Sequence, residues 1–204
     1  CAHEVEATQP QTVKPQRPNE WWLKRHDEKV KEIAKNKKKI DLVFIGDSIT
    51  HFMDDRAPGI LKANFPGITP LNLGFSADKT ENVLWRLRNG EFKGLKPKLV
   101  VIMIGTNNTG HRKDPASETV MGIRLIIKEV RQHSPESKVL LLSIFPRGET
   151  KDDQYRKINR EINKNLPGLA DNKQVFHLDI NQPFLDKQGR LSRELMPDLL
   201  HPNR

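Results

Sequence analysis

Short apolar runs alternate along this chain with longer segments in which apolar residues recur at helical spacing. Five such runs occur, at Ile40–Ile45, Thr69–Leu73, Leu99–Ile104, Val139–Phe145 and Val175–Ile180. Runs of this length that end at Gly or at polar residues are typical of buried strands. The first, third and fourth are apolar at consecutive positions and rich in Val, Ile and Leu, as expected for parallel strands covered on both faces.

Helices are predicted between these runs and before the first of them. The segments with helical spacing are Glu20–Lys35 with Asn19 as its cap, Asp54–Asn64, Glu81–Arg88 with Thr80 as its cap, Pro115–His133 with Asp114 as its cap, and Asp152–Asn165. Strands that alternate with helices through right-handed crossovers form a parallel sheet with helices on both faces. The sequence therefore predicts a three-layer α/β domain.

Length and composition indicate one domain preceded by a tether. Residues 19–204 are enough for a single domain with its own core, and 30% of all residues are charged. Residues 1–18 are polar and rich in Thr, Gln and Pro, so we expect a flexible tether. Trp21 and Trp22 lie at the start of the first helix. We interpret them as an apolar stripe that packs the helix against the domain; the alternative is a platform on which sugars stack. No run is long enough to span a bilayer.

The net charge of +9 raises the hypothesis of nucleic-acid binding. The positive residues are mostly scattered Lys, and their densest cluster, Lys35–Lys39, ends a predicted helix, where the helix dipole favours cations. No zinc-finger, RNA-recognition or basic-zipper pattern accompanies them. We therefore expect no nucleic-acid partner and interpret the charge as a solvated basic face that attracts acidic polymers.

Cys1 is the single cysteine, so the sequence offers no internal disulfide and no thiol-based metal cluster. An initial Cys followed by a polar, Pro-rich stretch resembles the start of a mature bacterial lipoprotein, in which this Cys is lipidated. On this hypothesis the protein is exported and anchored at the bacterial cell envelope, and it contacts a membrane only through the lipid. The alternative is that Cys1 marks an arbitrary boundary.

Polar residues that suit acyl transfer follow the predicted strands. They are Asp47-Ser48 after the first run, Gly74–Asp78 after the second, Gly105–Asn108 after the third, Pro146–Gly148 after the fourth, and Asp198–His201 beyond the fifth. Because the carboxyl ends of parallel strands meet at one edge of an open sheet, these groups are expected to lie together. They include a nucleophile, a base, a carboxylate and amide donors, which are the groups that acyl transfer uses.

Ser48 is the candidate nucleophile in this set. Its place between a strand and a helix start puts its hydroxyl beside free backbone N–H groups that can hold an oxyanion. The alternative interpretation of Gly46-Asp47-Ser48 is a plain helix cap. Asp198 and His201 are three residues apart, so a tight turn allows the carboxylate to reach its own imidazole.

These blocks resemble the SGNH (GDSL-type) hydrolase family. The resemblance runs from Ile40 to the C-terminus and rests on Gly46-Asp47-Ser48, Gly105-Thr106-Asn107-Asn108 and Asp198-x-x-His201 in this order. Asn72-Leu73-Gly74 and the segment around Trp85 are similar to the branch that contains the platelet-activating-factor acetylhydrolase catalytic subunits and bacterial acetylesterases. The resemblance implies a flavodoxin-like sheet with the strand order 2-1-3-4-5. No grouping of His, Asp and Glu in the sequence suggests a metal, and chemistry based on a serine needs neither a metal nor a cofactor.

The resemblance also implies a role for each matching residue. Ser48 is the nucleophile, His201 is the general base, and Asp198 is the carboxylate that orients His201. The oxyanion hole is formed by the backbone N–H groups of Ser48 and Ala77 and by the side-chain amide of Asn107.

Four further residues are weaker candidates at this edge of the sheet. His51, Asp78 and Arg147 are candidates for substrate contact, although His51 is equally compatible with a surface position and Arg147 with a simple turn. Asp179, at the end of the fifth run, competes with Asp198 as the orienting carboxylate.

The chain departs from the family pattern at two places. Ala77 stands where the family usually has Gly, and an Ala there is strained by about 1 kcal/mol or more if the backbone φ is positive. The sequence stops at Arg204, whereas the family continues into a helix that packs on the sheet. We therefore expect that C-terminal helix to be missing and the loop around His201 to lack its support.

The predicted function is a serine ester hydrolase that removes short acyl groups, acetyl above all, from carbohydrate. The chain has no long apolar insertion that would form a lid or a long-chain tunnel. An alternative substrate is a phospholipid-like acetyl ester. An alternative from a different class is a catalytically impaired carbohydrate-binding or scaffold protein. The sequence sets no oligomeric state.

Overall fold

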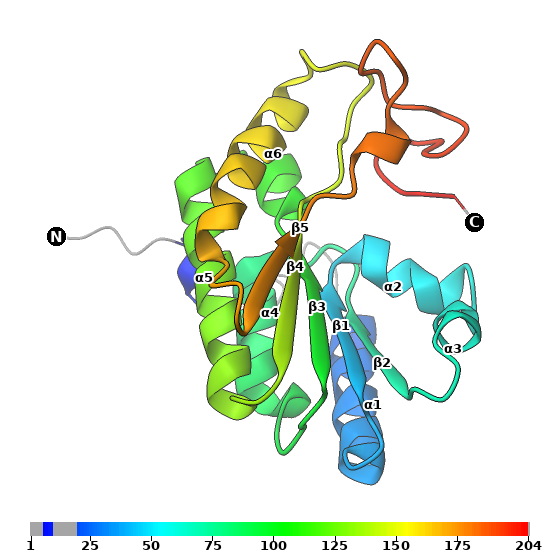
Figure 1. Ribbon diagram of the computed structural model, residues 1–204, viewed down its shortest axis with the longest axis vertical. Coiled ribbons are helices and arrows are strands. Elements are labelled where there is room, and N and C mark those ends of the chain that lie inside the picture. Colours follow the sequence, from blue (N-terminus) through cyan, green and yellow to red (C-terminus); the bar gives the residue numbers. More distant parts are fainter. Residues whose placement is uncertain (1–5, 10–19, 204) are drawn as a thin grey trace, which may run out of the picture.

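The core of the fold is a sheet of five parallel strands. A computed structural model of the chain describes residues 6–9 and 20–203. Its strands are β1 (Leu42–Gly46), β2 (Pro70–Gly74), β3 (Leu99–Met103), β4 (Lys138–Leu142) and β5 (Val175–Leu178). They pair in parallel in the order β2-β1-β3-β4-β5 (Figure 1). The predicted α/β class and the strand order are confirmed.

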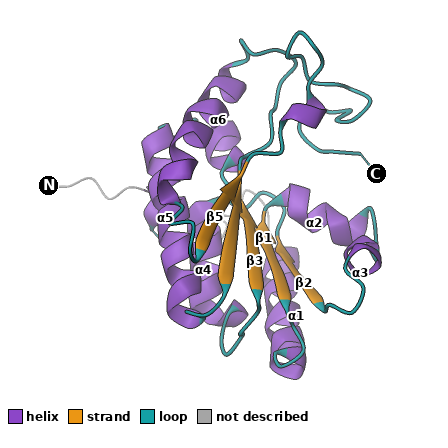
Figure 2. Ribbon diagram, viewed as in Figure 1, coloured by secondary structure: helices purple, strands orange, loops and turns teal. Residues whose placement is uncertain are grey.

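One face of the sheet is covered by four helices. These are α1 (Glu20–Asn36), α4 (Thr80–Arg86), α5 (Ala116–His133) and α6 (Gln154–Asn165). Alternate strand residues point to this layer, so Val43 and Ile45 of β1 are almost fully buried. The apolar sides of the helices meet them in one core, with Ile33, Ile126 and Ile162 among the contacts. Figure 2 shows α4, α5 and α6 to the left of the strands and α2 and α3 to their right.

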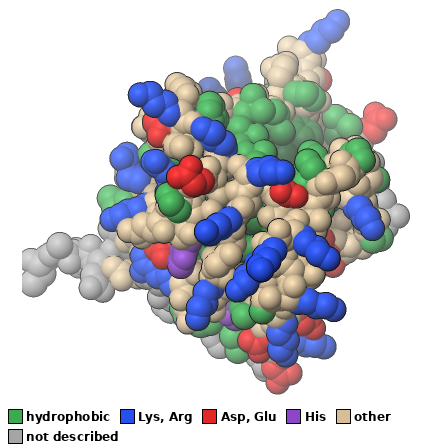
Figure 3. Space-filling view, turned by 60° about the horizontal axis from the view of Figure 1, so that its bottom comes forward, with side chains coloured by type: hydrophobic (Ala, Val, Ile, Leu, Met, Phe, Trp, Pro, Cys, Tyr) green, Lys and Arg blue, Asp and Glu red, His purple; other side chains and the backbone are tan. Residues whose placement is uncertain are grey.

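On the opposite face, the helices of the described residues lie beside β1 and β2. There α2 (Ser48–Asp55) and α3 (Ile60–Asn64) form the second helical layer. Within the described residues no helix covers the same face of β3, β4 and β5, where Val101 and Leu142 are half-buried and Leu178 is 45% exposed. Figure 3 shows hydrophobic side chains gathered in the upper part of that view of the surface.

The helix predicted over Asp54–Asn64 is wrong in its bounds. The chain enters α2 directly at Ser48, and it breaks the helix before α3 begins. Pro58 and Gly59 cause the break, because Pro removes a backbone donor and Gly59 adopts a φ of +84° that favours glycine.

Two predicted helix caps lie elsewhere. Thr80 is the first residue of α4 and Lys79 occupies its N-cap position, while Pro115 occupies the N-cap position of α5. Asp114 instead forms an ion pair with Arg112 at 2.6 Å. The predicted cap Asn19 lies outside the described residues.

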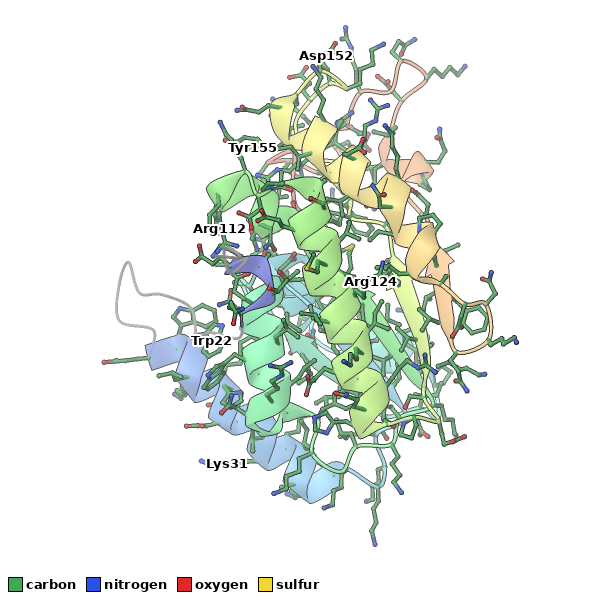
Figure 4. The ribbon with its side chains drawn as sticks, turned by 90° about the vertical axis from the view of Figure 1, so that its left-hand side faces the viewer. Trp22, Lys31, Arg112, Arg124, Asp152 and Tyr155 are labelled. Atoms are coloured by element: carbon green, nitrogen blue, oxygen red, sulfur yellow. The ribbon has the colours of Figure 1, made fainter. Side chains whose placement is uncertain are left out.

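Part of the predicted tether is packed against the body. Residues Glu6–Thr8 form a 3-10 turn in which Ala7 is fully buried. The Thr80 hydroxyl donates to the Ala7 carbonyl at 2.7 Å, and Arg112 pairs with Glu6 at 3.1 Å. Figure 4 shows this turn against α4 and α5, beside Arg112. The expectation of a flexible segment is therefore wrong for these residues, and Cys1, with its predicted lipid, lies outside the described part.

None of the helices in the described residues is both long and apolar enough to cross a bilayer.

Candidate active site

The carboxyl ends of β1 and β2 create the place where α2 begins. Gly46 and Gly74 are paired in the register of the sheet, and α2 runs directly over them. A Cβ on Gly46 would lie 2.1 Å from Thr50 Oγ1, and one on Gly74 would lie 2.3 Å from the His51 backbone nitrogen. The two glycines therefore allow the first turn of α2, with Ser48 as its first residue, to sit against the sheet.

Ser48 has a backbone N–H without a hydrogen-bond partner in the part of the chain that the structure describes. The first N–H groups of a helix have no partner within the helix, so the Ser48 N–H is available to a ligand. Asp47 is the N-cap, and its carboxylate accepts a hydrogen bond from Ile49 N at 3.0 Å. Burial raises the pKa of Asp47 to about 7, against the lowering effect of that hydrogen bond. Asp47 is thus the helix cap beside Ser48, and this cap is compatible with a nucleophile at Ser48.

A chain of hydrogen bonds joins Ser48, His201 and Asp198. Ser48 Oγ lies 2.8 Å from His201 Nε2, and His201 Nδ1 lies 2.6 Å from Asp198 Oδ2. The second carboxylate oxygen of Asp198 accepts hydrogen bonds from the backbone N–H of His201 at 2.7 Å and of Leu200 at 3.1 Å. Burial opposes ionisation of Asp198, but the hydrogen bonds from His201 hold its pKa below the usual value.

The loop that carries His201 is held in place by contacts with distant parts of the described chain. Leu199 adopts a φ of +59° and forms two backbone hydrogen bonds, donating to Met196 O at 2.9 Å and accepting from Gly148 N at 3.0 Å. Met196 is fully buried, and the Phe52 ring packs on the His201 imidazole with centroids 4.9 Å apart. Left-handed backbone at a non-glycine residue is costly and persists where its surroundings fix it. Contacts to α2 and to the segment that follows β4 therefore support the loop, contrary to the expectation.

Asp179, the competing carboxylate, lies away from this chain of hydrogen bonds. Its Oδ1 accepts a hydrogen bond from Asn181 N at 2.9 Å within the loop after β5. The carboxylate that contacts His201 is that of Asp198.

Asn107 is oriented by the backbone of the neighbouring loop. Its Nδ2 donates to the Asp78 carbonyl at 2.9 Å, and the residue is 5% exposed. An amide nitrogen has two hydrogens, so the second remains for a ligand. The arrangement places a fixed side-chain donor at the edge of the sheet that carries Ser48.

Ala77 adopts a left-handed backbone conformation, the case in which the sequence analysis expected strain. It is the third residue of a turn closed by Asp78 N donating to Phe75 O at 3.2 Å, and its φ is +68°. Turns with positive φ at this position favour Gly. Its own backbone N–H has no partner in the part of the chain that the structure describes, which is the state an oxyanion donor requires.

We predict that Ala77→Gly stabilises the fold. Relief of the left-handed strain is worth about 1–2 kcal/mol and the added chain entropy of Gly costs about 0.5–1 kcal/mol, so the free energy of unfolding is expected to rise by up to about 1 kcal/mol. Chemical denaturation measures this change. The matched control is Ala34→Gly, at an exposed position of α1, which is expected to lower the same quantity by about 0.5–1 kcal/mol. A loss of stability in Ala77→Gly would contradict the strain.

A buried ionic cluster lies beneath the Ala77 turn. Asp78 accepts hydrogen bonds from Trp22 Nε1 at 2.7 Å and from Arg86 Nε at 2.8 Å, and Arg86 also pairs with Glu91. His26 Nδ1 lies 2.7 Å from Glu91 Oε1. Asp78, Arg86 and Glu91 are fully buried, so the predicted contact of Asp78 with substrate is wrong. Asp78 supports the turn from within.

Ion pairs within this cluster offset the cost of burying its charged groups. Burial raises the pKa of Asp78 to about 6, and Arg86 and Trp22 act in the opposite direction. Burial lowers the pKa of Arg86, but its partners Glu91 and Asp78 raise it by more, so the pKa lies above its usual value and the guanidinium stays charged. Trp22 reaches the cluster from α1, on the α4 side of the molecule (Figure 4). Trp21, by contrast, is 45% exposed.

His51 and Arg147 both have partners in the protein. His51 is buried, and its Nδ1 lies 3.0 Å from Ser76 Oγ, so neither the pocket position nor the surface position predicted for it is found. Arg147 donates to Thr106 O at 2.8 Å and Thr106 Oγ1 at 3.1 Å. Its guanidinium therefore braces the loop that carries Asn107, and burial lowers its pKa.

An apolar cavity of about 340 Å³ adjoins His201 on the partly uncovered face of the sheet. Its walls include Phe52 and Met53 of α2, Val101 of β3 and Phe184 after β5. The sequence did not predict this space, because it arises between segments distant in the chain rather than from an inserted lid.

The described residues contain no group of His, Cys, Asp and Glu side chains that could hold a metal ion.

The fold and this set of strand-end groups define an ester hydrolase. The model of the GDSL-like Lipase/Acylhydrolase family matches residues 44–204, and the chain belongs to this family. Among curated proteins it is similar to the platelet-activating factor acetylhydrolase IB subunit alpha1 of Homo sapiens, with 34% identity over 199 residues, covering 97% of this chain and 83% of the relative.

Two solved structures show the same fold. A GDSL-like lipase from Bacteroides thetaiotaomicron has a TM-score of 0.67 at 23% identity, covering 85% of this chain and 89% of the other. An acetyl xylan esterase has a TM-score of 0.61 at 19% identity, covering 80% of this chain and 92% of the other.

Proposed function

We propose that this protein is a serine esterase that removes short acyl groups, acetyl above all, from carbohydrate. The observation that carries the proposal is the hydrogen-bonded chain from Ser48 Oγ through His201 to Asp198, with distances of 2.8 Å and 2.6 Å. A catalytically impaired binding protein would have no need of this geometry.

Each step of the reaction has a group in place. Ser48 Oγ attacks the ester carbonyl while His201 Nε2 takes its proton, and Asp198 stabilises the imidazolium that forms. The N–H groups of Ser48 and Ala77 and the Asn107 amide hold the oxyanion of the tetrahedral intermediate. His201 then gives the proton to the leaving alkoxide. Water, deprotonated by His201, releases the acid from the acyl-enzyme and regenerates Ser48.

The apolar cavity beside His201 favours a second candidate. A space of about 340 Å³ lined by Phe52 and Met53 accommodates more than a methyl group, and this would suit a longer acyl chain or a lipid-like ester. The relative named platelet-activating factor acetylhydrolase adds support for a phospholipid-like acetyl ester.

Hydrolysis of 4-nitrophenyl esters of increasing chain length tests the preference for a short acyl group. For a short-acyl esterase we expect kcat/KM for the acetate to exceed that for the octanoate by about tenfold or more, since a poorly placed chain costs reactive alignment. The control is Ser48→Ala, which removes the nucleophile. Equal rates on the two esters would favour a longer acyl chain, and no activity above Ser48→Ala would remove the esterase proposal. The rates on an acetylated oligosaccharide and on a phospholipid-like acetyl ester then separate the two acetyl substrates.

A further inference from the structure

Two of the three oxyanion donors in the proposed mechanism are tied to a single residue, Asp78. The N–H of Ala77 belongs to the turn that Asp78 N closes by donating to Phe75 O at 3.2 Å. The side chain of Asn107 comes from the loop after β3, and its Nδ2 is held by the hydrogen bond to Asp78 O at 2.9 Å. A displacement of Asp78 would therefore move a backbone donor and a side-chain donor together.

The carboxylate of Asp78 is fixed by one donor from α1 and one from α4. Trp22 Nε1 donates to its Oδ1 at 2.7 Å, and Arg86 Nε donates to its Oδ2 at 2.8 Å. All three side chains are fully buried. Hydrogen bonds to a charged group are stronger than those between neutral groups, and burial strengthens them further. These two bonds therefore fix the position of Asp78 relative to both helices.

The same two donors also contact the start of the turn. Arg86 Nη2 donates to Leu73 O at 3.1 Å at the end of β2, and the guanidinium lies over the Phe75 ring at 3.9 Å. Trp22 packs edge-on against that ring, with the two centroids 5.6 Å apart. The turn is thus held at Leu73, at Phe75 and at Asp78 by one pair of side chains.

Trp22 is the member of this pair whose polar contact stands apart from its packing. Arg86 donates to Asp78, Leu73 and Glu91, so its replacement would break several buried contacts at once. The indole N–H of Trp22 has one acceptor, Asp78 Oδ1. Loss of this N–H with the ring retained therefore acts on the position of Asp78 specifically.

We propose that Trp22 is a positioning residue for the ester hydrolysis, because its hydrogen bond to Asp78 fixes the direction of both the Ala77 N–H and the Asn107 amide. The proposal rests on the proposed function. Donors that are in place before substrate arrives stabilise the oxyanion of the transition state more than the bound ester, so Trp22 acts on kcat and leaves KM unchanged. A displacement of catalytic groups by about 1 Å lowers a rate by up to about 10²-fold.

Trp22→Phe tests this role, since it keeps a packed aromatic ring and removes the N–H. We expect kcat for 4-nitrophenyl acetate, per folded enzyme, to fall by about tenfold with KM unchanged. Should this variant fail to fold, replacement of Trp22 by benzothienylalanine keeps the two-ring shape with sulfur in place of N–H, and the same fall is expected. The control Trp85→Phe changes an indole that packs on Trp22 with centroids 5.5 Å apart and takes no part in the hydrogen bonds of the Asp78 carboxylate, so kcat is expected to stay unchanged.

A double-mutant cycle with Asn107→Ala separates positioning from a general loss of structure. Without the Asn107 amide, Trp22 has only the Ala77 N–H left to position, so Trp22→Phe is expected to lower kcat by about threefold or less in that background. Equal factors in the two backgrounds would overturn the proposal. An unchanged kcat in Trp22→Phe together with a lowered free energy of unfolding would overturn it as well, since that is the result of a purely structural role.

Hydrogen exchange of the Asp78 N–H, followed by NMR, separates this proposal from the proposed function. We expect faster exchange in Trp22→Phe than in the wild-type protein, while the Thr109 N–H, which donates to Gly105 O at 3.2 Å, exchanges at the same rate in both. Equal exchange of the Asp78 N–H in the two proteins would overturn the positioning role. Absence of esterase activity in the wild-type protein would overturn the proposed function, and the exchange rates would still decide whether Trp22 fixes the turn.

Discussion

Replacement of His201 by Ala is expected to lower kcat/KM for 4-nitrophenyl acetate by at least about 10⁴-fold. Without the imidazole at 2.8 Å from its oxygen, the Ser48 hydroxyl has no acceptor for its proton and is a poor nucleophile at neutral pH. The fold is expected to remain, because His201 lies in a terminal loop that Leu199 and Met196 fix through their own contacts.

The double variant gives the sharper measurement. If Ser48 and His201 act as one unit, Ser48→Ala with His201→Ala retains the same residual rate as either single variant, since the second change removes nothing further. The control His133→Ala replaces a histidine at the end of α5 whose contacts are with Glu129 and Phe92. More than a tenth of the wild-type rate in His201→Ala would show that the histidine is not the base.

Replacement of Asn107 by Ala is expected to lower kcat by about 10²- to 10³-fold with little change in KM. A donor aimed at the oxyanion acts in the transition state, where its loss costs about 3 kcal/mol. The Asp78 carbonyl holds the amide by one hydrogen, so the other is fixed before substrate arrives. Stopped-flow measurement of acylation with 4-nitrophenyl acetate isolates the affected step.

The neighbouring asparagine is the matched control. Asn108 is fully buried, accepts from Thr80 N at 3.1 Å and donates to Asp114 Oδ2 at 3.0 Å, so its amide is used by the fold. Asn108→Ala is expected to lower the free energy of unfolding by about 1–3 kcal/mol. Asn107→Ala is expected to leave that quantity within about 1 kcal/mol, because a single hydrogen bond is lost. The reverse assignment of the two effects would contradict the donor role of Asn107.

The sheet was predictable because its signal is local. The apolar residues of β1 and β3 follow one another without polar interruption, a pattern typical of buried parallel strands. Helical cover on both faces, which this pattern also predicted for β3 and β4, is found at β1, whereas one face of β3 and β4 has no helix over it within the described residues. The helix start at Ser48 was predicted from the motif, but the helical segment itself was placed at Asp54–Asn64, after α2 has almost ended. The first turn of α2 packs closely on Gly46 and Gly74, and only the assembled sheet reveals this contact.

The residues of the candidate site were predictable to the extent that they lie in short blocks at strand ends. The buried contacts that hold those residues in place were not predictable. Trp22 meets Asp78 across 56 positions and His26 meets Glu91 across 65, so no spacing in the sequence connects them. Asp78 was assigned to substrate contact because it follows a predicted strand at the carboxyl edge of the sheet. The sequence does not show that it is buried against Arg86.

The buried ionic cluster beneath the Ala77 turn makes α1 an integral part of the domain that carries the candidate site. The family match begins at residue 44, after α1 has ended, yet Trp22 and His26 are partners of carboxylates that lie within the matched segment. A transplant of the matched segment alone would leave Asp78 and Glu91 with Arg86 as their shared counter-ion in an opened interior. A chimaera that exchanges this domain with that of a relative should therefore include α1 together with the Ala77 turn that α1 supports.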